Sequence, residues 1–200
     1  KRFITNGNAE ILLVLARSEP GTKDGRGLSL FACYGKDNVK VRRIENKLGI
    51  HGSPTCELQF NDTPAQLIGK RKFGLIKYVM DMMNGARLGV AGQALGISQA
   101  AYEEALRYAR AREQFGKSIY AIPVVANLLM EMRVTLESDR SLLYAACHWV
   151  DLRNKLEERI ETLKAEGKDF SQETAKLKEA IRVAALLTPM AKYVLSENAN

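Results

Sequence analysis

The chain has 200 residues, of which 46% are hydrophobic and 26% charged, and its net charge is +7, a composition typical of a soluble globular protein with one or two domains. No apolar run approaches the ~20 residues of a membrane span, and three widely spaced cysteines with two histidines exclude a disulfide scaffold and a zinc or other metal site, so we expect a cytoplasmic protein with no membrane partner. No P-loop, GxGxxG, zinc-finger or RNP pattern accompanies the positive charge, and nucleic acid is therefore not an expected partner.

Residues 1–70 alternate short runs of high β propensity with turn residues. The runs cover residues 3–5, 11–15, 28–32, 39–41 and 56–60. Gly, Asn, Asp and Pro separate them, which predicts antiparallel strands joined by turns. Neither face of the run at 28–33 is strongly polar, so we expect that strand to lie in the middle of a sheet.

Three long helical patterns follow, over residues 73–111, 124–166 and 171–198. The first is rich in glycine, and each helical glycine costs about 0.8–1 kcal/mol relative to alanine. We therefore expect a neighbouring helix or a ligand to approach it closely. The second and third carry apolar stripes, and Pro189 is expected to kink the third.

Heavily charged residues surround the apolar stripe over residues 152–178, which predicts a projecting, coiled-coil-like arm. The predicted fold class is α+β. A β-domain over residues 1–70 precedes an antiparallel bundle of long helices over residues 71–200.

Four segments resemble motifs of the acyl-CoA dehydrogenases, and they occur in the family's order. They are residues 1–7 (KRFITNG), 47–58 (KLGIHGSPTCEL), 84–96 (NGARLGVAGQALG) and 108–119 (YARAREQFGKSI). The resemblance covers about residues 1–150 and resumes at residues 191–193, so the charged arm looks like an insertion. It implies a fragment, with part of the middle β-domain and an incomplete C-terminal helical domain.

The resemblance implies an FAD cofactor. It places the Thr5 hydroxyl near flavin N5 and Phe3 near the isoalloxazine, while residues 112–115 reach the FAD of a neighbouring subunit. The cofactor-binding residues implied are Phe3, Ile4, Thr5, Arg112, Gln114 and Phe115. Judged without the resemblance, the first segment is an ordinary β-strand, and the second is a cation near a helix C-terminus followed by a turn. Pro123 and its neighbours stand where many members have a glutamine that also contacts the cofactor.

The resemblance also implies an acyl-CoA site at Asn84, Gly85 and Arg87. The alternative for Arg87 is an arginine paired inside the bundle. One branch of the family carries its catalytic glutamate immediately before this arginine, but Ala86 stands there and cannot accept a proton. The base is therefore expected beyond Asn200, and no catalytic residue is assigned within the chain.

The implied activity is that of an oxidoreductase acting on a CH–CH bond. It would oxidise an acyl-CoA thioester to a trans-2-enoyl-CoA, as in fatty acid β-oxidation, and pass the electrons to an electron-transferring flavoprotein. The expected assembly is a homotetramer, a dimer of dimers. Two alternatives stay open: a non-enzymatic flavoprotein relative with a binding role, for example on DNA, and a helical interaction protein without a cofactor.

Overall fold

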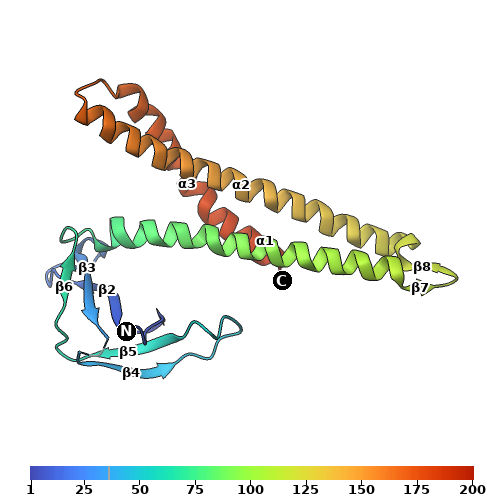
Figure 1. Cartoon of the computed structure of the whole chain (residues 1–200), viewed down its shortest axis with the longest axis horizontal. Helices are drawn as coiled ribbons and strands as arrows, with labels where there is room; N and C mark the ends of the chain where they lie inside the picture. Colours follow the sequence, from blue (N-terminus) through green and yellow to red (C-terminus); the bar gives the residue numbers. More distant parts are fainter. Residues whose placement is uncertain (36) are drawn as a thin grey trace. The chain divides into compact units, whose positions relative to one another are not determined.

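A computed structural model describes residues 1–35 and 37–200 (Figure 1). The chain divides into two compact units, Lys1–Met82 and Met83–Asn200. The first contains the strands of the β-region and the second contains most of the helical residues. The predicted α+β class, with antiparallel β-structure followed by long helices, is confirmed.

The first unit contains two three-stranded antiparallel sheets. One has the order β1-β5-β4 and the other the order β2-β3-β6. The strands are β1 (Ile4–Thr5), β2 (Ile11–Arg17), β3 (Leu28–Tyr34), β4 (Val39–Ile44), β5 (Thr55–Phe60) and β6 (Gln66–Ile68). As predicted, β3 is a central strand, paired with β2 on one side and β6 on the other. Strand β6 was not predicted, because three residues are too few to display an alternating pattern.

The core of the first unit joins both sheets. Alternate residues of β2, Leu12 and Val14, are buried against Cys33 of β3 and against Cys56 and Leu58 of β5. Because side chains alternate across a strand, Ile11 and Leu13 of β2 fall on the opposite, exposed face. A short 3₁₀ turn, η1 (Gly25–Gly27), precedes β3.

The helices are α1 (Met80–Ala111), α2 (Pro123–Ala165) and α3 (Ser171–Asn198), each close to a predicted range. The predicted start of the first helix differs, because residues 74–79 form a π-helical turn, η2 (Gly74–Val79). Gly74 is required there, since a Cβ atom would lie 2.5 Å from the backbone of Ser29. The α3 helix continues past Pro189.

The three helices share one apolar core. It combines residues of α1, α2 and α3, namely Ala91, Ala94, Leu95, Leu136, Leu143, Ala146, Ala191 and Leu195. The close approach expected at the α1 glycines is not made within the described chain. A Cβ added at Gly85, Gly89, Gly92 or Gly96 meets nothing within 4 Å. Alanines, not glycines, provide the short side chains at the helix contact.

A buried carboxylate lies in this seam, and it was not predicted from the sequence. Asp139 of α2 is 2% exposed. Its Oδ1 accepts a hydrogen bond from Asn198 Nδ2 at 2.9 Å, while Oδ2 is buried with no partner in the described part of the chain.

The end of α2 and the start of α3 form the charged arm as an antiparallel hairpin (Figure 1). Ile160 and Leu163 are buried in it, and Gly167, with φ +66°, lies in the turn. Between residues 145 and 180 no described large hydrophobic side chain is exposed. None of the helices within residues 1–35 and 37–200 is both long enough and apolar enough to cross a membrane.

Candidate functional site

The first predicted site segment lies at a sheet edge. The backbone amino group of Lys1 donates to the carbonyl of Leu58 at 2.6 Å, and β1 pairs Ile4 with Cys56 and Thr5 with Thr55. Ile4 is half-buried and contacts the core, whereas Thr5 is exposed. Phe3 is 72% exposed and has φ +62°. The strand therefore presents an aromatic ring and a hydroxyl group at the edge of the sheet.

The second predicted segment is a tight hairpin after α1. Strands β7 (Glu113–Gln114) and β8 (Lys117–Ser118) are joined by Phe115 and Gly116. Both turn residues have positive φ, +53° and +73°, as a type I′ hairpin turn requires. This backbone is unfavourable for phenylalanine, yet the Phe115 side chain is 89% exposed. Its exposed ring, carried on a strained backbone, is a candidate for binding.

Backbone and side-chain hydrogen bonds fix this hairpin to the end of α1. Ser118 Oγ donates to the carbonyl of Ala109 at 2.7 Å, and the Ile119 amide donates to the carbonyl of Arg112 at 2.8 Å. A 3₁₀ turn, η3 (Ile119–Ala121), then leads to Pro123, the first residue of α2. The hydrogen bond from Ser118 to Ala109 was not predicted, because a serine after a helix has no distinctive sequence pattern.

Arg112 is exposed, and no carboxylate of the described residues lies within ion-pair distance of it. A guanidinium group offers a rigid fork of donors that matches phosphate oxygens. Gln114 and Phe115 on the same hairpin add an amide and an aromatic ring. This donor set fits a ligand that combines phosphate with an aromatic group.

The third predicted segment lies in the first turns of α1. Arg87 is half-buried and donates through Nη1 to Asn84 Oδ1 at 3.0 Å. Its remaining donors meet no carboxylate within residues 1–35 and 37–200, in contrast to the alternative of an arginine paired inside the bundle. A Cβ atom added at the neighbouring Gly85 would meet nothing within 4 Å. The turn can thus offer a positive charge to an anionic group.

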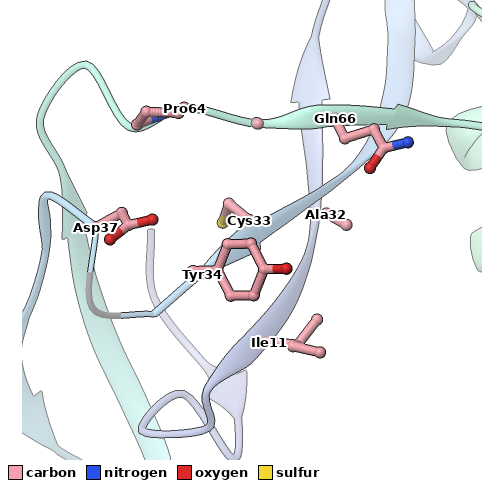
Figure 2. Close-up of a pocket in the computed structure, with 8 residues that line it drawn as sticks. Ile11, Ala32, Cys33, Tyr34, Asp37, Pro64 and Gln66 are labelled. Carbon is pink, nitrogen blue, oxygen red and sulfur yellow. The ribbon is translucent and has the colours of Figure 1, made fainter.

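A separate hollow of about 470 Å³ lies on the first unit (Figure 2). It is lined by Ile11, Ala32, Cys33, Tyr34, Asp37, Pro64, Ala65 and Gln66. Burial, and then the charge of Asp37, raises the pKa of the Cys33 thiol. The thiol is therefore protonated at neutral pH and is a poor nucleophile. The described residues also contain no group of three or more His, Cys, Asp or Glu side chains able to hold a metal ion.

Comparison with known proteins identifies both parts of the chain. Residues 1–63 match the acyl-CoA dehydrogenase middle domain, and residues 76–185 match the acyl-CoA dehydrogenase C-terminal domain. A short-chain-specific acyl-CoA dehydrogenase of Clostridium acetobutylicum is 38% identical, over 74% of this chain and 40% of its own length.

Several solved structures superpose on the whole chain. Butyryl-CoA dehydrogenase from Megasphaera elsdenii superposes with a TM-score of 0.67 and 30% identity over 53% of its length. A chain of a structure described as the electron transferring flavoprotein of Acidaminococcus fermentans superposes with a TM-score of 0.66 and 32% identity, also over 53% of its length. The chain thus spans about half the length of the relatives it matches or less. On the strength of the matched domains and the identity, it belongs to the acyl-CoA dehydrogenase family.

Proposed function

We propose that this chain is the middle and C-terminal part of an FAD-dependent acyl-CoA dehydrogenase. The whole protein would oxidise an acyl-CoA thioester to a trans-2-enoyl-CoA. Electrons would then pass to an electron-transferring flavoprotein. Family membership supports this proposal, and the names of the relatives make short-chain thioesters the first substrates to test.

The strained hairpin after α1 is the observation that carries the cofactor assignment. It holds Phe115 in an unfavourable backbone conformation and keeps Arg112 free of carboxylates. Neither property stabilises the chain alone, but both suit a ligand with phosphate and aromatic groups. In the proposal, Arg112, Gln114 and Phe115 bind the FAD of a neighbouring subunit, which requires a homotetramer or a comparable assembly.

Strand β1 is proposed to lie against the flavin. FAD, when bound, supplies the acceptor for the hydride that leaves the thioester. Phe3 would pack near its ring system, and the exposed Thr5 hydroxyl would donate a hydrogen bond that stabilises negative charge. Ile4 anchors the strand to the core of the first unit.

The α1 turn is proposed to bind the thioester. Asn84 orients Arg87, whose free donors face an anionic part of the CoA, and Gly85 leaves room for it. A general base must lie within about 2.6–3.2 Å of the proton it removes, directly or through one water. Ala86 cannot serve, so we place the base outside these 200 residues.

The test is anaerobic titration of the FAD-loaded whole protein with saturated acyl-CoAs, starting with butyryl-CoA and extending to longer chains. We expect at least one thioester to bleach the flavin absorbance near ~450 nm, a property of the cofactor. Ala86→Ser, which adds no carboxylate, should leave this bleaching in place. If no thioester reduces the flavin, the enzyme proposal fails, and a binding role of the flavoprotein, including DNA binding, takes its place.

A further inference from the structure

The π-helical turn η2 leads directly into α1, the helix that carries Asn84 and Arg87. The amide of Tyr78 donates to the carbonyl of Phe73 at 3.4 Å, and the amide of Met80 donates to the carbonyl of Leu75. Each of these bonds spans five residues, whereas the bonds of an α-helix span four. Turns of this kind are rare in globular proteins and occur frequently at functional sites.

Contacts within the first unit hold η2 in place. The turn packs against β2, β3 and η1. Leu75 lies directly over Gly25, where an added Cβ atom would be 2.6 Å from Leu75 Cδ2. The hydroxyl of Tyr78 accepts a hydrogen bond from the amide of Lys70 at 2.9 Å. The direction in which Leu75 points is therefore fixed by the first unit.

The extra residue of η2 rotates every side chain that follows it. An α-helix turns by about 100° per residue, so one additional residue in a turn displaces the later side chains by about 100° around the helix axis. With the π-turn, Arg87 lies about 20° around the axis from Leu75, whereas an unbroken α-helix would place it about 120° away. The turn therefore decides on which side of α1 the Arg87 guanidinium lies.

The burial pattern of the helix agrees with this rotation. Met80, Asn84, Leu88 and Ala91 are buried or half-buried and follow one another at α-helical spacing. The five-residue step from Leu75 to Met80 brings Leu75 to the same side as this stripe. The π-turn thus connects the side of η2 that packs within the first unit to the half-buried side of α1.

This rotation bears on the proposed chemistry. The thioester is proposed to bind at Arg87, and the flavin that oxidises it is proposed to lie against β1. Reacting groups must be held in one geometry, and a misplacement of about 1 Å can lower a rate by roughly 100-fold. A guanidinium at the wrong rotation around α1 would not meet an anionic group of a thioester held in that geometry.

We propose that η2 is a positioning element for substrate binding, because its extra residue directs Arg87 toward the CoA thioester. This inference rests on the proposed function, which assigns Arg87 to the CoA. The competing explanation is that η2 serves packing alone. In that case a change in the turn would alter stability, but it would leave the contribution of Arg87 to binding intact.

The test is a double-mutant cycle on the FAD-loaded whole protein, with the Kd for coenzyme A measured by calorimetry. Deletion of Lys77, an exposed residue of η2, converts the turn to α-helical spacing. Arg87→Ala is made with and without this deletion. We expect each single change to raise the Kd at least about tenfold. Once Lys77 is deleted, Arg87→Ala should change the Kd by less than about twofold.

Three further variants control for charge and folding. Lys77→Ala removes the same charge, keeps the length of the turn and should retain the wild-type Kd. An alanine inserted after the exposed Asp81 leaves η2 intact and rotates Arg87 by about 100° in the opposite sense. It should act like the deletion, and it carries the same cycle if the deleted protein does not fold. The deletion combined with the insertion should restore the wild-type Kd.

Two results would overturn the positioning role of η2: a wild-type Kd after the deletion or the insertion, or an Arg87→Ala effect that stays about tenfold in either background. An unchanged Kd for Arg87→Ala in the otherwise wild-type protein would reject the assignment of Arg87, and the inference with it. If the cycle gives the expected coupling but no thioester bleaches the flavin, the proposed activity fails while the positioning of Arg87 toward CoA stands.

Discussion

The charged arm of the helical unit and the β4–β5 loop (residues 45–54) of the first unit differ in how they hold their apolar residues. The charged arm at the end of α2 and the start of α3 buries Ile160 and Leu163 and exposes no large hydrophobic side chain between residues 145 and 180 of the described chain. The β4–β5 loop buries neither Leu48 nor Ile50 and holds its tip with polar contacts. The arm covers its own apolar residues, whereas no described residue covers Leu48 or Ile50 of the loop.

The largest expected effect tests this contrast directly. Leu163→Ala in the arm should lower the free energy of unfolding by about 2–5 kcal/mol, because Leu163 is 4% exposed and its removal leaves a cavity. Leu48→Ala in the loop should change it by less than about 0.5 kcal/mol. Urea denaturation of the two variants measures both values. Equal losses would show that Leu48 is packed in solution, contrary to the structure.

A second prediction concerns the one buried carboxylate of the helical core. Asn198→Ala should cost about 1–3 kcal/mol, since it removes the hydrogen bond that Asp139 receives and leaves the group buried without that partner. Asp139→Ala combined with Asn198→Ala should recover part of the loss. A double-mutant cycle by urea denaturation measures the coupling, and a coupling near zero would contradict the assignment.

The smallest expected effect isolates the backbone strain of the loop. Ile50→Gly removes the unfavourable left-handed isoleucine, worth about 1–2 kcal/mol, while glycine makes the unfolded chain more flexible. We expect a net gain in stability of up to about 1 kcal/mol. Leu13→Gly, in the interior of β2, should instead destabilise by about 0.5–1 kcal/mol or more. If Ile50→Gly lowers the free energy of unfolding as much as Leu13→Gly does, the backbone of the loop is not strained at Ile50.

The sequence predicted the long helices and the strands of the first unit because their apolar periodicities extend over several residues. It could not predict η2, since residues 74–79 have an ordinary helical pattern and the π-turn depends on the contact of Gly74 with Ser29. The burial of Asp139 also depends on a contact that is distant in the sequence, because its hydrogen-bond partner Asn198 lies 59 residues away. The glycines of α1 predicted a close contact that no described residue makes.

For the candidate site, the motifs proposed each segment, but they did not predict how each segment is held. The positive φ of Phe115 and the bracing of its hairpin by Ser118 emerge only from the structure. The exposure of Leu48 and Ile50 likewise depends on how the loop folds. Short motifs specify which side chains are available, and long-range hydrogen bonds decide where those side chains project.

The most direct test of the central claim, that this chain holds FAD through the hairpin after α1, is the affinity of the whole protein for FAD in an Arg112→Ala variant. Arg159→Ala, which removes an exposed arginine of the arm, is the matched control. We expect Arg112→Ala to raise the Kd for FAD at least about tenfold in fluorescence titration, or about 1.4 kcal/mol, and Arg159→Ala to leave it unchanged. An unchanged Kd in a well-folded Arg112→Ala protein would contradict the account.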